Sequence, residues 1–151
     1  MPTAGQRIKA LDFAGSAQAS DATAHNNIST VASFGTPQVS VTFTAPTSGS
    51  VAISIGCMAQ DDVQNNIVYL DWEMRLTNSG GLAVSTIGAF ERRLAVPCPG
   101  AVGIVSNVTK TATVTGLTPG QLYFLRTTHA ANLNGTADVF MRRLDVAPFF
   151  A

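Results

Sequence analysis

The sequence is poor in charged residues. Only 12% of its 151 residues are Asp, Glu, Lys or Arg, and nine basic residues balance nine acidic ones. An ordinary soluble domain carries about 25% charged residues. A balanced charge gives no long-range attraction for nucleic acid or an anionic membrane, so we expect neither as a partner. A weakly charged surface also does little to keep copies apart, which favours either a coat of neutral polar side chains or an oligomer interface.

Long apolar runs and clustered cysteines are also missing from the sequence. No run of about 18 apolar residues occurs, so we expect no membrane-spanning helix. The first residues lack the apolar centre of a secretory signal, which predicts a protein made in the cytoplasm. Cys57 and Cys98 do not have the spacing of a metal site, and we expect free buried thiols, with a disulfide as the alternative.

Catalytic groupings are sparse. The only histidines are His25 and His129, and no G-x-S-x-G segment is present to hold a nucleophilic serine. Asp61 and Asp62 lie in a polar stretch but lack the D-x-D-x-D-G register of a calcium loop, so we expect a solvated loop, with calcium binding as the alternative. We therefore predict no catalytic residue, no metal ligand and no bound cofactor.

The other charged pairs also argue against an enzyme. Asp71 and Glu73 are two residues apart and project from the same face of a strand, whereas a glycosidase needs two carboxylates held across a cleft. Arg142 and Arg143 are adjacent and project from opposite faces of a strand, so they form no basic patch. Salt bridges at an interface are the expected use of these arginines. The sequence thus predicts a protein that is not an enzyme.

A two-residue hydrophobic period is the strongest pattern that is present. Apolar and polar residues alternate in 39–44, 51–57 and 66–76. This period is typical of strands that bury one face. Together with 121–130, these segments supply a predicted core. Its members are Val41, Phe43, Val51, Ile53, Ile55, Leu70, Trp72, Met74, Leu122 and Phe124.

Turn sequences divide the chain into strands and predict an all-β fold. The connections include "APTSG", "NSGG", "GLTPG" and "NLNG", which are rich in residues that favour turns. No helix is predicted. The candidate strands are 27–34, 39–44, 50–57, 66–76, 82–87, 90–96, 110–115, 121–130 and 136–146. The expected fold is an antiparallel β-sandwich of eight to nine strands.

The N-terminal segment has a different composition. Residues 1–27 are mostly small and polar, so we expect an extended arm, followed by a sandwich domain at 28–151. A few apolar and basic residues in this arm are expected to dock on a neighbouring subunit or a particle, the alternative being a frayed terminus. These attachment residues are Arg7, Ile8, Lys9, Leu11 and Phe13.

Two sandwich families share patterns with this chain. "FTAPTSGSVAISIG", "VTGLTPGQLYFLRTTHA" and "VFMRRL" resemble the C1q and tumour-necrosis-factor type of jelly roll over most of 28–147, which implies a compact homotrimer. The turn formed by Leu117, Pro119, Gly120 and Tyr123 instead resembles the tyrosine corner of fibronectin type III and immunoglobulin-like sandwiches. The corner covers only seven residues, so the jelly roll is favoured.

A further resemblance covers the whole chain. "AGQRIKALDF", "VTFTAPTSG", "GLTPGQLY" and "RRLDVAP" are similar to segments of small virion proteins encoded by tailed phages and prophages of actinobacteria. The resemblance implies a non-enzymatic component of the virion. The expected function is capsid decoration, in which the protein stabilises the shell through trimerisation and contacts with the major capsid protein.

The alternative function is a minor tail or fibre protein that contacts other tail proteins and binds a receptor or carbohydrate. Sugar sites favour exposed aromatic side chains near carboxylates. Only Tyr69, Trp72 and Tyr123 are expected to stack on a sugar, and the hydrophobic period places Trp72 in the core.

Overall fold

The computed structural model describes residues 16–61, 63, 66–85, 93–98, 100, 105–133 and 135–149. These residues form nine strands and no helix, which confirms the all-β prediction. None of them belongs to a helix long and apolar enough to cross a membrane. The strands are β1 (Ala17–Asp21), β2 (Ser40–Thr44), β3 (Val51–Gln60), β4 (Ile67–Leu76), β5 (Ala83–Ser85), β6 (Leu94–Pro97), β7 (Ser106–Val114), β8 (Leu122–Ala131) and β9 (Asp138–Pro148).

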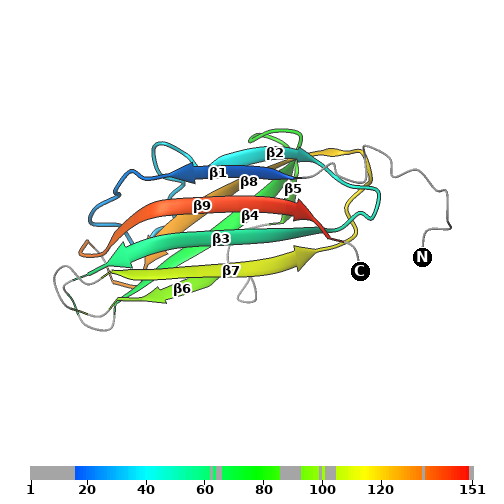
Figure 1. Cartoon of the computed structure of the whole chain (residues 1–151). Helices are drawn as coiled ribbons and strands as arrows, with labels where there is room; N and C mark the ends of the chain where they lie inside the picture. Colours follow the sequence, from blue (N-terminus) through cyan, green and yellow to red (C-terminus); the bar gives the residue numbers. More distant parts are fainter. Residues whose placement is uncertain are drawn as a thin grey trace.

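The strands form two antiparallel sheets. One has the order β1-β9-β3-β7, and the other has the order β2-β8-β4-β5, with β6 also paired to β4. Figure 1 shows the first sheet in front of the second. The chain passes between the sheets repeatedly, from β1 to β2, from β3 to β4 and from β8 to β9. This order is that of a double-sheet jelly roll, which confirms the expected fold over the immunoglobulin-like alternative.

The core lies between the sheets and follows the two-residue period of the long strands. Val51, Ile53 and Ile55 on β3 are buried, and so are Leu70 and Trp72 on β4. Each such side chain removed from water contributes about 1.5–3 kcal/mol. The alternating segments of the sequence therefore supply both halves of the core.

The turn before β8 forms a tyrosine corner within the jelly roll. The backbone N–H of Thr118 donates to the hydroxyl oxygen of Tyr123 over 3.0 Å. Tyr123 is buried, and its ring stacks on buried Phe43 of β2 with a centroid separation of 5.7 Å. The residues that lead into this corner are Leu117, Pro119 and Gly120. A local corner of this type therefore occurs without an immunoglobulin-like strand order.

The predicted phase of β8 is wrong. Phe124 is only half-buried, and Leu122 is 39% exposed, so neither belongs to the core. Four consecutive apolar residues at 122–125 fit either phase of the two-residue period. Pairing with β4 decides between them, because Leu125 lies opposite buried Met74 whereas Phe124 lies opposite Arg75 on the outer face.

The predicted arm contains a strand of the sandwich. β1 pairs with β9, from Ala17 opposite Val146 to Asp21 opposite Arg142. The sandwich therefore begins no later than Ala17, rather than at residue 28. Strand pairing uses backbone groups, so a small and polar sequence can form an edge strand without large apolar side chains. The attachment residues Arg7, Ile8, Lys9, Leu11 and Phe13 lie outside the described residues.

The predicted strand at 27–34 does not form. Ser33 makes one isolated bridge with His129, and the N–H of Ile28 donates to the carbonyl of Ala137 over 2.9 Å. Asn27 has a φ of 54°, in the left-handed region that interrupts extended backbone. This segment therefore follows the end of β8 as an irregular connection.

Candidate functional site

A β-bulge in β9 directs one side chain to the outer face of the sheet and the next one into the interior. Met141 and Arg142 together lie opposite Cys57, where the register between β3 and β9 shifts. Met141 adopts a left-handed φ of 51°. A bulge changes the direction of the side chains on its strand, and here Met141 is 52% exposed whereas Arg142 is fully buried.

Arg142 is the centre of a buried polar cluster. Its Nη2 donates to Asp21 Oδ2 over 2.6 Å and to the carbonyl of Pro37 over 2.7 Å. Its Nη1 donates to the carbonyl of Phe34 over 3.0 Å and lies 3.4 Å from His129 Nδ1. A buried charge requires a partner and hydrogen bonds of this kind. Arg142 thus joins β1, β8, β9 and the loop at 34–37, and the predicted interface salt bridge is instead an internal one.

Two groups of this cluster, Asp21 and His129, have shifted pKa values. Burial, with Arg142 and His25 nearby, lowers the pKa of His129 to about 4, so its ring is neutral. Burial alone would raise the pKa of Asp21, but hydrogen bonds from Arg142 and Thr23 outweigh it and hold that pKa well below its usual range. The cluster therefore consists of a stable ion pair beside a neutral histidine.

A glycine leaves room for this cluster. Gly35 has a φ of 73°, and a Cβ there would collide with the Arg142 guanidinium and lie 2.9 Å from His129 Cε1. His25 Nε2 is 3.5 Å from Asp21 Oδ2, and its ring lies 5.0 Å from that of His129. Ser33 pairs with His129 through the backbone, and its hydroxyl oxygen accepts a hydrogen bond from the N–H of Gly35 over 3.2 Å. The arrangement fixes β1 in place against β9.

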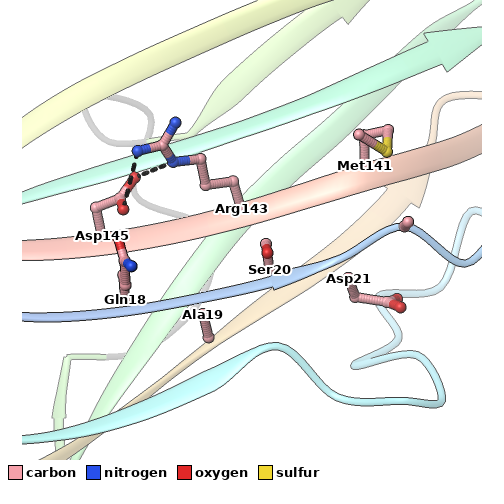
Figure 2. Close-up of a pocket in the computed structure, with 8 residues that line it drawn as sticks. Gln18, Ala19, Ser20, Asp21, Met141, Arg143 and Asp145 are labelled. Atoms are coloured by element: carbon pink, nitrogen blue, oxygen red, sulfur yellow. Dashed lines mark hydrogen bonds and ion pairs between the residues drawn. The ribbon is translucent and has the colours of Figure 1, made fainter.

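On the outer side of β1 and β9 lies a groove of about 410 Å³. Figure 2 shows Gln18 and Ser20 on the opposite side of β1 from Ala19, and Arg143 beside Asp145 on β9. Arg143 Nε donates to Asp145 Oδ2 over 2.6 Å. The Arg143 side chain is 64% exposed, so solvent screens this ion pair.

Next to this groove, the outward-facing side chains of 52–56 on β3 and 109–113 on β7 are small and uncharged. Cross-strand partners on β3 and β7 include Ala52 with Thr113 and Gly56 with Thr109. Ser54 Oγ lies 2.7 Å from Thr111 Oγ1, which links the two strands by a hydroxyl hydrogen bond. We call this surface the neutral face, and its residues are Ala52, Ser54, Gly56, Thr109, Thr111, Thr113 and Ala147.

The outer face of the other sheet is charged. Glu73 is 4% exposed and accepts hydrogen bonds from Arg126 on β8 and from Arg75 Nε, the latter over 3.0 Å. Burial favours the protonated carboxyl, but the bonds from Arg75 and Arg126 outweigh it and lower the pKa of Glu73. The Arg126 guanidinium also lies 3.4 Å from the ring centroid of Phe34. Asp71 and Glu73 do share a face, as predicted, but Glu73 is held in an ion-pair network.

A small pocket of about 230 Å³ lies on this charged face near the end of β8. The Arg93 guanidinium is stacked 4.1 Å from the ring centroid of Tyr69. Asp71 is 3% exposed, and its Oδ1 accepts a hydrogen bond from the N–H of Trp72 over 2.7 Å. We call it the Tyr69 pocket, and its lining includes Thr30, Ala32, Tyr69, Asp71, Arg93, Thr128 and Ala130. The sequence suggested Tyr69 as a stacking residue and Arg93 as part of an interface salt bridge, but it did not place the two side by side.

The acidic loop after β3 is a structural connection. Asp61 is 3% exposed rather than solvated, because it accepts hydrogen bonds from the N–H of Val63 over 2.8 Å, from Thr136 Oγ1 over 3.1 Å and from Asn66. Asp62 lies outside the described residues. Where the structure is described, no group of His, Cys, Asp and Glu is placed to hold a metal ion.

The two cysteines are free and buried, as expected. Burial raises the pKa of the Cys57 thiol to about 12, and nearby Cys98 adds to this effect. Burial likewise raises the pKa of Cys98. Both side chains therefore remain protonated and act as small apolar residues at neutral pH.

The sequence matches no protein-family model and no curated protein. Among solved structures, a carbohydrate-binding module (CBM6cm-2) of Cellvibrio mixtus lichenase 5A, in complex with cellotriose, is 13% identical with a TM-score of 0.39, and the match covers 95% of this chain and 96% of that chain. Structures of infectious bursal disease virus, strains Gx and Gt, are 16% and 10% identical with TM-scores of 0.45 and 0.47. These matches cover 89% and 97% of this chain but only 29% and 37% of the virus chains. The likeness is confined to the β-sandwich and assigns no function.

Proposed function

We propose that this chain is a non-enzymatic structural protein of a phage virion, which decorates the capsid and stabilises the shell by forming trimers and contacting the major capsid protein. The observation that carries the proposal is the neutral face. It consists of small, uncharged residues on β3, β7 and β9. Another protein can approach such a surface closely without removing a charge from water.

The surroundings of the neutral face also support a contact surface. Met141, held outward by the bulge, adds an exposed apolar side chain beside the groove of Arg143 and Asp145. Methionine adapts its shape to different partners, which suits a residue at an interface. Arg143 and Asp145 pair with each other, so their charges are already compensated in the free protein.

The described carboxylates favour a structural protein over an enzyme. Asp21 and Glu73 are bound by arginines, and Asp61 accepts hydrogen bonds from Val63 and Asn66 in its own loop and from Thr136 before β9. A general acid or base instead needs access to a substrate and a pKa near the working pH. The lowered pKa values of Asp21 and Glu73 keep both groups ionised at neutral pH.

Binding of the purified full chain to undecorated phage particles tests this proposal, together with the number of copies per virion. Hundreds of copies support decoration, whereas a handful to a few dozen indicate a tail or fibre position. Light scattering should give a trimer, and a stable monomer at micromolar concentration would contradict that part of the proposal. Deletion of residues 2–14 removes the attachment residues but keeps β1, and we expect this variant to fold and to lose most particle binding.

A second candidate function is a receptor- or carbohydrate-binding role in a minor tail or fibre protein. The Tyr69 pocket favours it, because an aromatic side chain and a carboxylate lie together there on the outer face. Tyr123 and Trp72, the other candidate stacking residues, are buried in the core. Retained glycan binding by a chain that does not coat particles would support this second function over decoration.

A further inference from the structure

We propose that the Tyr69 pocket binds a single neutral sugar unit, an inference that rests on the second candidate function. The pocket gathers residues from four parts of the chain, which are β4, β8, the residue immediately before β6 and the connection between β1 and β2. These residues include Tyr69 and Asp71, Thr128 and Ala130, Arg93, and Thr30 and Ala32.

The polar groups of the pocket match the hydroxyl groups of a sugar. A hydroxyl can both donate and accept, so neighbouring hydroxyls of one ring can donate to a carboxylate and accept from a guanidinium. Asp71 and Arg93 supply these two groups, and the Thr128 hydroxyl can take either role. Hydrogen bonds to charged groups are stronger than those between neutral groups, which favours recognition by this pair.

The apolar groups of the pocket match the other side of a sugar ring. Ala32 and Ala130 offer small apolar walls, and Tyr69 contributes the edge and body of an aromatic side chain. The Arg93 guanidinium lies over the Tyr69 ring, so an aromatic ring and a cation stand together in the lining. Small-molecule sites characteristically combine apolar walls with a few polar groups that fix orientation.

The charge and size of the pocket narrow the ligand class. One carboxylate and one guanidinium balance each other, so a neutral ligand is favoured over a phosphate or a sugar acid. A volume of about 230 Å³ lies below the range of about 300–1,000 Å³ typical of drug-sized ligands. The pocket is therefore suited to one sugar ring, such as the terminal unit of a glycan, with the rest of the glycan in solvent.

A titration of the ¹⁵N-labelled full chain with methyl glycosides of common neutral hexoses and pentoses tests this inference by NMR. We expect saturable shifts at the backbone amides of Tyr69, Asp71 and Thr128, with an affinity in the millimolar range. Tyr69→Ala and Asp71→Asn should each weaken binding at least about tenfold. Arg143→Ala, in the groove on the opposite sheet, serves as the matched control and should leave the affinity unchanged.

The results distinguish a wrong binding site from the absence of a carbohydrate-binding function. Should Asp71→Asn fail to fold, Thr128→Val and Tyr69→Ala test the same pocket, with thermal melting as the check of folding. Saturable shifts confined to another surface would overturn the Tyr69 pocket but keep a carbohydrate-binding function. The absence of saturable shifts with every glycoside would overturn this inference and remove the support that the pocket gives to the second candidate function.

Discussion

The two sheets share one core but differ on their outer faces. Each outer face holds an arginine–carboxylate pair: Arg143 with Asp145 on β9, and Arg126 with Glu73 across β8 and β4. The first pair has side chains that are 64% and 28% exposed, whereas those of the second are 13% and 6% exposed. An exposed pair contributes little to stability, but a covered carboxylate must keep its partners. The outer face of the β1-β9-β3-β7 sheet is thus free to adapt to another protein, while the outer face of the other sheet is fixed by its own contacts.

The largest loss of stability is expected in the core that the two sheets share. Trp72→Ala should lower the free energy of unfolding by about 3–5 kcal/mol, because Trp72 is 2% exposed and its removal leaves a cavity. Urea denaturation measures the loss. A loss below about 0.5 kcal/mol, as at an exposed site, would contradict this placement.

Substituting the adjacent Arg142 and Arg143 of β9 tests whether the bulge turns only one of them into the interior. Arg142→Ala should lower the free energy of unfolding by about 3–5 kcal/mol, because Asp21 would be left without its buried partner. Arg143→Ala should change it by less than about 0.5 kcal/mol, since that side chain is exposed. Equal losses in the two variants would show that the bulge does not separate the interior from the neutral face.

Lowering the pH should lower the free energy of unfolding, because His129 is buried in its neutral form. Its pKa is about 4 in the folded protein and about 6.5 in an unfolded chain, so the unfolded state binds a proton first as the pH falls. This contribution is complete above pH 6.5 and is lost as the pH falls towards 4, by up to about 3 kcal/mol. His129→Gln should remove the dependence in that window. A wild-type stability that stays flat between these pH values would contradict the neutral, buried state of His129.

The smallest expected change in stability comes from neutralising one carboxylate on each outer face. Glu73→Gln should lower the free energy of unfolding by about 1.5–3 kcal/mol. The hydrogen bonds from Arg75 and Arg126 would then be accepted by a neutral amide instead of a carboxylate. Asp145→Asn, the matched change on β9, should cost less than about 0.5 kcal/mol. Chemical denaturation of both variants provides the comparison, and a larger loss for Asp145→Asn would reverse it.

The sequence predicted β3 and β4 because apolar side chains occupy every second position along them. β3 and β4 alternate apolar and polar residues, so the fold class and the positions of Ile53 and Trp72 could be read directly. β8 was placed correctly, but consecutive apolar residues made its phase ambiguous, and Phe124 lies on the outer face. Period alone cannot choose between two apolar phases, whereas pairing with β4 does.

The sequence did not predict features that depend on distant partners. β1 carries small residues and pairs through its backbone, so its alternation of Ala and polar residues gave no sign of a strand. Arg142 is buried because a bulge turns it inward, and its partner Asp21 lies 121 positions away in the sequence. The Tyr69 pocket likewise joins Arg93 to residues of β4 and β8, which only the folded chain brings together.

The central claim is that the neutral face contacts other proteins of the particle, and one substitution placed on each sheet tests it. Thr111 on β7 and Thr42 on β2 are both exposed strand residues. Thr111→Lys places a charge on the neutral face, and Thr42→Lys places the same charge on the other sheet. Occupancy of undecorated particles should fall at least about tenfold for Thr111→Lys, because contact would bury the charge, and should remain at the wild-type level for Thr42→Lys. Full occupancy with Thr111→Lys, or an equal loss with both variants, would contradict the account.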